Sequence, residues 1–176
     1  MFRKLYNREL NRISVEQYKE SQKLPISLVL DNVRSSHNIG SAFRTSDAFK
    51  IEKIYLCGIC ATPPTPEIHK SALGAEFSVD WEYSQDTLEL VKRLKGDGYT
   101  IISVEQAENS TSLEDITIES DKKYALIFGN EVKGVDQDVV NASDICLEIP
   151  QYGTKHSLNV SVSIGITLWE LIKHYI

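Results

Sequence analysis

Three stretches of the sequence combine polar side chains with glycine, and each begins at the end of a short apolar run that predicts a strand. They are residues 31–44, 127–135 and 149–163. In a parallel α/β sheet the carboxyl ends of the strands are where ligands bind. The sequence contains neither a GxGxxG nor a GxxxxGK[ST] pattern, so neither a dinucleotide site nor a P-loop is indicated. We therefore expect a ligand site of another kind at this edge of the sheet.

Individual residues in these stretches allow a functional and a purely structural interpretation. Gly129 and Gly134 would let the backbone approach a ligand closely, or they are ordinary turn glycines. Asn38 could cap a helix, or it could reach the site together with Arg44, which is otherwise a solvated cation. In the third stretch, polar Ser157, Asn159, Ser161 and Ser163 alternate with apolar residues. Polar groups within an apolar run need partners, which a ligand or facing backbone would supply.

The elements that must position these stretches follow from periodicity and from helix and turn signals. Strands are expected over 26–30, 51–57, 77–81, 99–104, 124–128 and 146–149. Helices are expected over 3–22 (in two pieces), 38–49, 67–73, 84–95, 136–142 and 159–175. Ser14 and Gln17 fit a capping box, and Pro25 is expected to end the N-terminal arm. Strands that alternate with helices predict the α/β class with a mainly parallel sheet.

Composition excludes several classes of protein. The chain has 176 residues, of which 41% are hydrophobic, so one domain with a real core is expected. Apolar runs are too short to span a bilayer, and the N-terminus lacks the apolar stretch of an export signal. Three cysteines without such a signal favour a reducing cytoplasm. Cys57 and Cys60 have only Cys146 as a further thiol, so no metal site is expected, and Cys57 is interpreted as a buried strand-end residue.

The charge is unevenly distributed. The net charge of −6 would by itself argue against a nucleic-acid partner. Residues 1–25, however, contain six Lys/Arg against three Glu, whereas residues 101–150 have a net charge of −8. The basic arm either contacts a polyanion or is a solvated helix. The net charge therefore does not exclude RNA, and it predicts few phosphate contacts per subunit and salt-sensitive binding.

The three stretches together resemble the motifs of the SPOUT superfamily and, within it, the TrmH/SpoU family of RNA ribose 2′-O-methyltransferases. The first motif corresponds to Asn38, Gly40 and Arg44, and the second to Phe128, Gly129, Glu131 and Gly134. The third corresponds to Ile149 and Pro150 followed by Ser157, Leu158, Asn159, Val160 and Ser161. The motifs occur in the family's order, and the resemblance covers residues 26–176. We therefore expect a basic helical arm over 1–25 and a methyltransferase domain over 26–176.

The resemblance implies a deep trefoil knot in the C-terminal part of the sheet and S-adenosylmethionine (AdoMet) as the cofactor. It implies a cofactor pocket lined by Val104, Glu105, Gly129, Ile149 and Leu158. It also implies a homodimer whose interface includes the last helix. Because arginine is a poor base, Arg44 is expected to clamp a phosphate and orient the ribose hydroxyl. Asn38 would position Arg44 or the ribose, and Glu131, Ser157 and Asn159 would fix the substrate pocket and the knot loops.

The substrate expected from the resemblance is tRNA, with guanosine favoured as the methylated nucleoside, and ribosomal RNA remains open. The stretch 70–75, Lys-Ser-Ala-Leu-Gly-Ala, resembles the branch of the family that acts on tRNA. His37 and His156 adjoin the motifs and could move a proton near neutral pH. A non-catalytic RNA-binding or assembly protein on the same scaffold is the competing interpretation. The retained Asn38, Arg44, Glu131, Ser157 and Asn159 argue against it.

Overall fold

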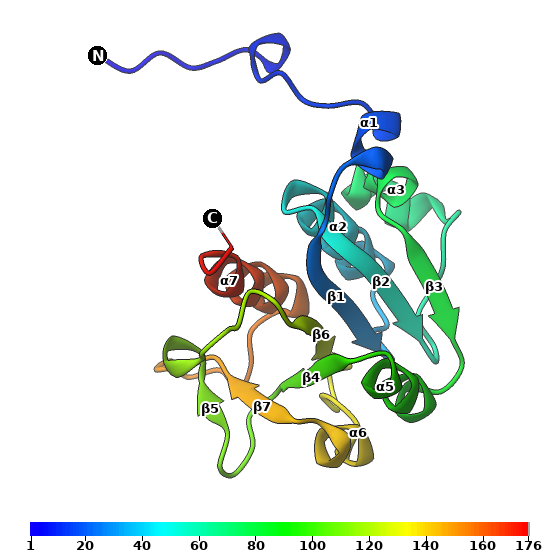
Figure 1. Ribbon diagram of the computed structural model, residues 1–176, viewed down its shortest axis with the longest axis vertical. Helices are drawn as coiled ribbons and strands as arrows, with labels where there is room; N and C mark the ends of the chain where they lie inside the picture. The colour runs from blue at the N-terminus through cyan, green and yellow to red at the C-terminus, as the bar shows by residue number, and fades with distance from the viewer. Residues whose placement is uncertain (176) are drawn as a thin grey trace.

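Seven strands form one sheet in the order β3-β2-β1-β6-β4-β7-β5 in the computed structural model, which describes residues 1–175 (Figure 1). The strands are β1 (Leu24–Asp31), β2 (Ile51–Cys57), β3 (Trp81–Ser84), β4 (Tyr99–Val104), β5 (Thr111–Ser112), β6 (Lys123–Phe128) and β7 (Ile145–Glu148). Every pairing between these strands is parallel. The expected α/β class with a parallel sheet is therefore confirmed.

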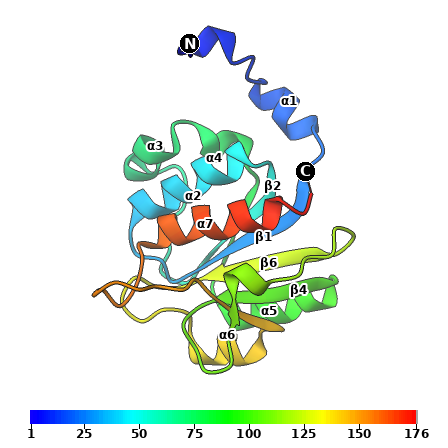
Figure 2. The ribbon, with the colours of Figure 1, turned by 90° about the vertical axis from the view of Figure 1, so that its left-hand side faces the viewer.

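Helices cover both faces of the sheet. They are α1 (Val15–Glu20), α2 (Ser36–Ala48), α3 (Pro66–Ala72), α4 (Ala75–Ser78), α5 (Thr87–Gly96), α6 (Gln137–Ala142) and α7 (Val160–Ile172), with short 3₁₀ turns η1 (Asn7–Glu9) and η2 (Leu113–Asp115). Helices α2, α3, α4 and α7 lie on one face, and α5 and α6 lie on the other (Figure 2). Since α2 and α7 run side by side, the segments that follow β1 and β7 are brought together.

The two faces of the sheet bury separate apolar cores. Alternate residues of β1 point to opposite faces, as the pleat requires: Ile26, Leu28 and Leu30 join the core under α2 and α7, whereas Val29 joins the core under α5 and α6. All four of these side chains are essentially inaccessible to solvent. The sheet is thus buried on both sides, which is why its strands are continuous apolar runs.

The N-terminal arm differs from the expectation of two helical pieces over 3–22. The capping box is present, with Ser14 accepting from the Gln17 N–H at 3.2 Å, but the helix that it starts covers only Val15–Glu20. Before Ser14 the arm forms only the 3₁₀ turn Asn7–Glu9, which buries no residue. A short segment without packing gains too little to form a stable helix. The arm projects away from the domain in both ribbon views (Figure 1, Figure 2).

Pro25 does not end the arm as expected, because β1 already begins at Leu24. The register of β1 against β2 shifts between Leu24 and Ser27. Such an irregularity lets a strand accommodate a proline, which has no N–H to donate to the ladder.

The expected strand over 77–81 is also wrong, although Phe77, Val79 and Trp81 alternate with polar residues. Leu73 and Gly74 adopt left-handed conformations, with φ of 53° and 93°, and they reverse the chain into the single helical turn of α4. Only from Trp81 does the chain pair with β2. The other main elements lie within a few residues of their expected bounds, and those of β2 and β4 are identical. No helix within residues 1–175 is long and apolar enough to cross a membrane.

Candidate active site

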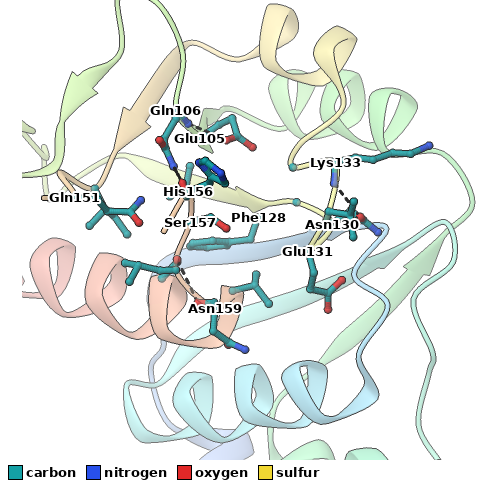
Figure 3. Close-up of a pocket in the computed structure, with 18 residues that line it drawn as sticks. Glu105, Gln106, Phe128, Asn130, Glu131, Lys133, Gln151, His156, Ser157 and Asn159 are labelled. Atoms are coloured by element: carbon teal, nitrogen blue, oxygen red, sulfur yellow. Dashed lines mark hydrogen bonds between the residues drawn. The ribbon is translucent and has the colours of Figure 1, made fainter. Parts of the chain in front are cut away.

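A pocket of about 480 Å³ lies at the carboxyl ends of β4, β6 and β7, in front of the N-terminus of α7 (Figure 3). Three segments wall it: 104–106 after β4, 128–134 after β6, and 149–160 between β7 and α7. All five residues expected to bind the cofactor line this pocket, namely Val104, Glu105, Gly129, Ile149 and Leu158. Glu131, Ser157 and Asn159 line it as well. Asn38 and Arg44 are not among the lining residues.

The loop 129–134 is a tight turn that leaves no room for a side chain at its first glycine. Asn130 and Gly134 exchange two backbone hydrogen bonds of 3.0 and 2.9 Å. A Cβ added to Gly129 would lie 2.0 Å from the Gly134 carbonyl carbon. The Asn130 side-chain oxygen accepts from the Val132 and Lys133 N–H groups, and its amide donates to the Asn32 carbonyl at 2.8 Å. This wall of the pocket is therefore backbone that can approach a ligand closely.

Glu131 connects this loop to the start of α2. Its carboxylate accepts from the N–H groups of Arg34 and Ser35, each at 3.0 Å, and from the Asn38 side-chain amide at 3.1 Å. Burial acts to raise the pKa of Glu131, but these hydrogen bonds to the charged form outweigh it, so the pKa lies below its ordinary value. Glu131 therefore stays ionised as it holds the N-terminus of α2 against the loop.

Asn38 extends the same network to the third segment. Its side-chain oxygen accepts from the Asn159 amide at 3.3 Å, and the Asn159 oxygen accepts from the Ser161 N–H at 2.8 Å as the N-cap of α7. Asn38 is not the cap of its own helix, because Ser35 fills that position. Figure 3 shows Glu131 and Asn159 on the side of the pocket that faces α2. One chain of side chains, Glu131–Asn38–Asn159, thus joins the three motif stretches 31–44, 127–135 and 149–163.

The polar residues of the third segment divide between the loop and the helix. Ser157 and Leu158 line the pocket, and Leu158 remains 37% exposed. The alternation expected to need partners ends at Val160, where α7 begins and the period becomes helical. Asn159 and Ser161 then satisfy each other at the helix start, through Oγ as well as N–H.

The first motif serves helix packing as well as the site. A Cβ on Gly40 would lie 2.1 Å from Ser71 Oγ and 2.3 Å from the Ile68 carbonyl oxygen, so glycine is what lets α2 approach α3. Arg44 lies on the exposed side of α2, and its guanidinium has no hydrogen-bond or ion-pair partner within residues 1–175. Asn38 bonds to Glu131 and Asn159 rather than to Arg44.

Of the histidines and cysteines within residues 1–175, His156 alone lines the pocket. His37 is exposed on α2, and His156 lines the pocket as part of its loop. Burial raises the pKa of the Cys57 thiol to about 12 and that of Cys60 to about 11. Cys57 is the fully buried last residue of β2, which confirms the structural interpretation. Among residues 1–175, no group of three or more His, Cys, Asp or Glu side chains is arranged to hold a metal ion.

Sequence reasoning did not single out Asn130 or Gln106. Asn130 organises the 129–134 loop, and the Gln106 amide donates to the His156 carbonyl at 2.6 Å. A usable signal existed for Asn130, because an asparagine directly after Gly129 commonly bonds to backbone two residues on. Gln106 follows the expected pocket residue Glu105, but nothing in its local sequence indicates a bond to a residue 50 positions away.

Comparison with known proteins finds one matching family model and several relatives of similar sequence. A family model described as "SpoU rRNA Methylase family" matches residues 25–169. A Staphylococcus aureus protein assigned to the TrmH family of tRNA/rRNA methyltransferases is 28% identical over 159 residues, which is 90% of this chain and 63% of that protein. A tRNA (guanosine(18)-2′-O)-methyltransferase of Borreliella burgdorferi is 27% identical over 148 residues, 84% of this chain and 66% of that protein. The chain thus spans less than two thirds of these relatives.

Solved structures agree with the sequence relatives. The TrmH/SpoU tRNA modifying enzyme of A. aeolicus superposes with a TM-score of 0.78 at 27% identity, covering 90% of this chain and 79% of that one. The AdoMet-bound rRNA methyltransferase of Sinorhizobium meliloti superposes with a TM-score of 0.82 at 27% identity, covering 88% of this chain and 58% of that one.

Proposed function

The chain belongs to the SpoU rRNA methylase family, and from this premise we propose that it is an AdoMet-dependent RNA ribose 2′-O-methyltransferase. The observation that carries the proposal is the network Glu131–Asn38–Asn159, which joins the three motif segments beside one pocket. A scaffold that had lost the activity would have no need to keep these half-buried hydrogen bonds between distant segments.

The pocket fits the cofactor that the family implies. Its volume of about 480 Å³ lies in the range of small-molecule sites, roughly 300–1,000 Å³. Gly129 presents bare backbone, and Ile149 and Leu158 supply apolar surface beside the polar groups of the loops. AdoMet, when bound, supplies an activated methyl group on a sulfonium. Residues 104–106, 128–134 and 149–160 would hold it.

The chain's own residues must bring a ribose hydroxyl to that methyl group and help to remove its proton. We assign to Arg44 the clamping of a neighbouring phosphate and the orientation of the hydroxyl, because guanidinium pairs with phosphate in a fixed bidentate geometry. Asn38, Glu131 and Asn159 are assigned the positioning of α2 and α7 around the substrate. Ser157 lines the pocket proposed for the cofactor and is assigned a role in holding the substrate beside it.

A homodimer would explain an exposed apolar face. Val162, Ile166 and Trp169 lie on one stripe of α7 and are 47%, 39% and 53% exposed. The Trp169 ring packs against Phe49, which follows α2 five residues after Arg44; the ring centroids are 6.1 Å apart and the planes are tilted by 43°. We propose that this face pairs with the same face of a second copy. An interface there would bring Arg44, which lies outside the pocket of its own chain, next to the partner.

A deep trefoil knot belongs to the same proposal. The segment 149–159 leaves the sheet after β7 and lines one pocket together with the loops 104–106 and 128–134 before α7 begins. We propose that it passes through the loop of chain formed by 104–128, in the manner that family membership implies. The cofactor pocket would then be the inner surface of the knot.

We propose tRNA as the substrate, with guanosine as the favoured nucleoside. The B. burgdorferi relative that acts on guanosine in tRNA supports this choice, and the S. meliloti relative keeps ribosomal RNA as the second candidate. Three exposed cations on the loops after β1, β6 and β7 have no ion-pair partner within residues 1–175 and would meet phosphates, namely Arg34, Lys133 and Lys155. With such a substrate the protein would work in the cytoplasm.

Isothermal titration calorimetry with S-adenosylhomocysteine tests the proposal against a non-catalytic RNA-binding protein. We expect saturable binding at one site per chain, because the pocket is preformed. A folded protein that shows no heat of binding would contradict the enzyme assignment and favour the binding protein.

A further inference from the structure

Two consecutive residues after β4 each fix one of the two loops that wall the pocket. Glu105 bonds to the loop that follows β6, and Gln106 bonds to the loop between β7 and α7. Figure 3 shows both side chains on the side of the pocket opposite Glu131 and Asn159. The pocket is thus held from two sides, by the Glu131–Asn38–Asn159 network on one and by this pair on the other.

The Glu105 carboxylate is turned toward protein backbone. Oε2 accepts from the Val135 N–H at 2.9 Å, and Oε1 accepts from the Gln106 N–H at 2.8 Å. The carboxylate also lies directly against Gly134, where an added Cβ would be 2.2 Å from Oε2 and where φ is +71°. Both oxygens therefore have partners before any ligand arrives. Glu105 is therefore suited to holding the 129–134 turn.

Gln106 holds a segment that has few other ties. Its amide donates to the His156 carbonyl at 2.6 Å. Among the hydrogen bonds within residues 1–175, this is the only one that connects residues 151–158 to another part of the chain. The stretch contains no helix or strand, and Tyr152 on it is 93% exposed. The side chain of Gln106 thus supplies the hydrogen bond that ties residues 151–158 to the rest of the domain.

We propose that Glu105 and Gln106 form a brace that sets the separation of the two pocket walls and so preorganises the AdoMet site. The proposal rests on the function proposed above, and both residues act through the loops as positioning residues. Preorganisation raises affinity because the ordering of the loops is completed before the ligand binds. Loss of the brace weakens cofactor binding and leaves the chemical step at saturation nearly unchanged.

The test compares the wild type with Gln106→Ala and Glu105→Gln, together with matched controls. Glu108→Gln removes the same charge from the same loop, and Gln85→Ala removes an exposed glutamine elsewhere; neither side chain makes a hydrogen bond within residues 1–175. The loss of one hydrogen bond predicts binding of S-adenosylhomocysteine weaker by about 3- to 10-fold for both brace variants. The controls should match the wild type. With bulk tRNA as methyl acceptor, the KM for AdoMet should rise by the same factor while kcat changes less than twofold.

A second measurement reports on the brace without a ligand. Trypsin cleaves after lysine, so limited digestion at Lys155 should be faster in Gln106→Ala than in the wild type, with the Gln85→Ala control cleaved at the wild-type rate. Brace variants that bind S-adenosylhomocysteine within twofold of the wild type, or a kcat that falls tenfold at saturation, would overturn the proposal, as would an unchanged cleavage rate at Lys155. A wild type that does not bind S-adenosylhomocysteine but shows the difference in cleavage would instead refute the proposed function.

Discussion

The side-chain amide of Asn38 donates to the Glu131 carboxylate over 3.1 Å and so joins residues that lie 93 positions apart in the sequence. The same carboxylate accepts from two backbone N–H groups at the start of α2. It must therefore be ionised and correctly placed for α2 to sit beside the pocket. This contact explains how an acid and an amide from different motifs act as one unit.

Acidification should weaken the hydrogen bonds that Glu131 accepts from Asn38 and from the start of α2. The pKa of Glu131 is below its ordinary value, because hydrogen bonds to the charged form outweigh burial. A lowered pKa in the folded state adds stability that is present above the unfolded pKa of about 4.3 and is lost as the pH falls through the folded pKa. The wild type should exceed Glu131→Gln in free energy of unfolding at pH 7, and the difference should shrink toward pH 3. Urea unfolding at several pH values measures it, and a constant difference would refute the assigned role.

Gly129→Ala should disrupt the pocket, because an added Cβ would lie 2.0 Å from the carbonyl carbon of Gly134 and 2.1 Å from the Val135 nitrogen. Overpacking of this kind costs about 1–3 kcal/mol. Gly96→Ala is the control, since a Cβ there meets nothing within 4 Å at the end of α5. The melting temperature and the affinity for S-adenosylhomocysteine should both fall in Gly129→Ala, and both should match the wild type in Gly96→Ala. Equal behaviour of the two would contradict the close approach at Gly129.

Trp169→Glu should convert the proposed dimer into monomers. The substitution places a charge in the exposed stripe of α7, where pairing with a second copy would have to desolvate it. Phe77→Glu is the control, because Phe77 is similarly exposed, at 59%, but lies on α4. Light scattering coupled to gel filtration gives the mass. A wild type with the mass of a monomer would refute the dimer. A Trp169→Glu variant with the mass of a dimer would show that the interface does not include this face of α7.

Arg44→Ala should lose methyl transfer by at least a hundredfold while binding S-adenosylhomocysteine within about twofold of the wild type. The reason is that Arg44 does not line the pocket and is exposed on α2, so its loss leaves the cofactor walls intact. Arg44→Lys should recover little activity, because an ammonium cannot reproduce the bidentate fork. Retention of full activity by Arg44→Ala would refute the role given to it.

The sequence was sufficient for the elements whose signals are local. The apolar runs of β2 and β4 predicted their bounds, and the Ser14–Gln17 box predicted where α1 begins. The strand expected over 77–81 failed because alternation over so few residues also fits one helical turn followed by a strand. What decides between them is the pair of left-handed residues Leu73 and Gly74, and a leucine in that conformation has no sequence signature.

The candidate site could likewise be predicted only in part. The motif resemblance identified some of the pocket-lining residues in each of the three segments, including Gly129 and Leu158. It did not reveal that Asn38 bonds to Asn159 instead of to Arg44, because the partner of a side chain 121 positions away depends on how α2 and α7 pack. For the same reason the Gln106 contact with His156 emerged only from the fold.

The most direct test of the central claim is to map ribose methylation by mass spectrometry in total RNA from a strain that lacks the gene, beside RNA from the parent strain. The proposed function predicts that one 2′-O-methylated nucleotide, in tRNA, disappears in the deletion. It should return when the wild-type gene is supplied and not when the Arg44→Ala variant is. An unchanged set of 2′-O-methyl nucleotides, or the loss of a base methylation instead, would contradict the account.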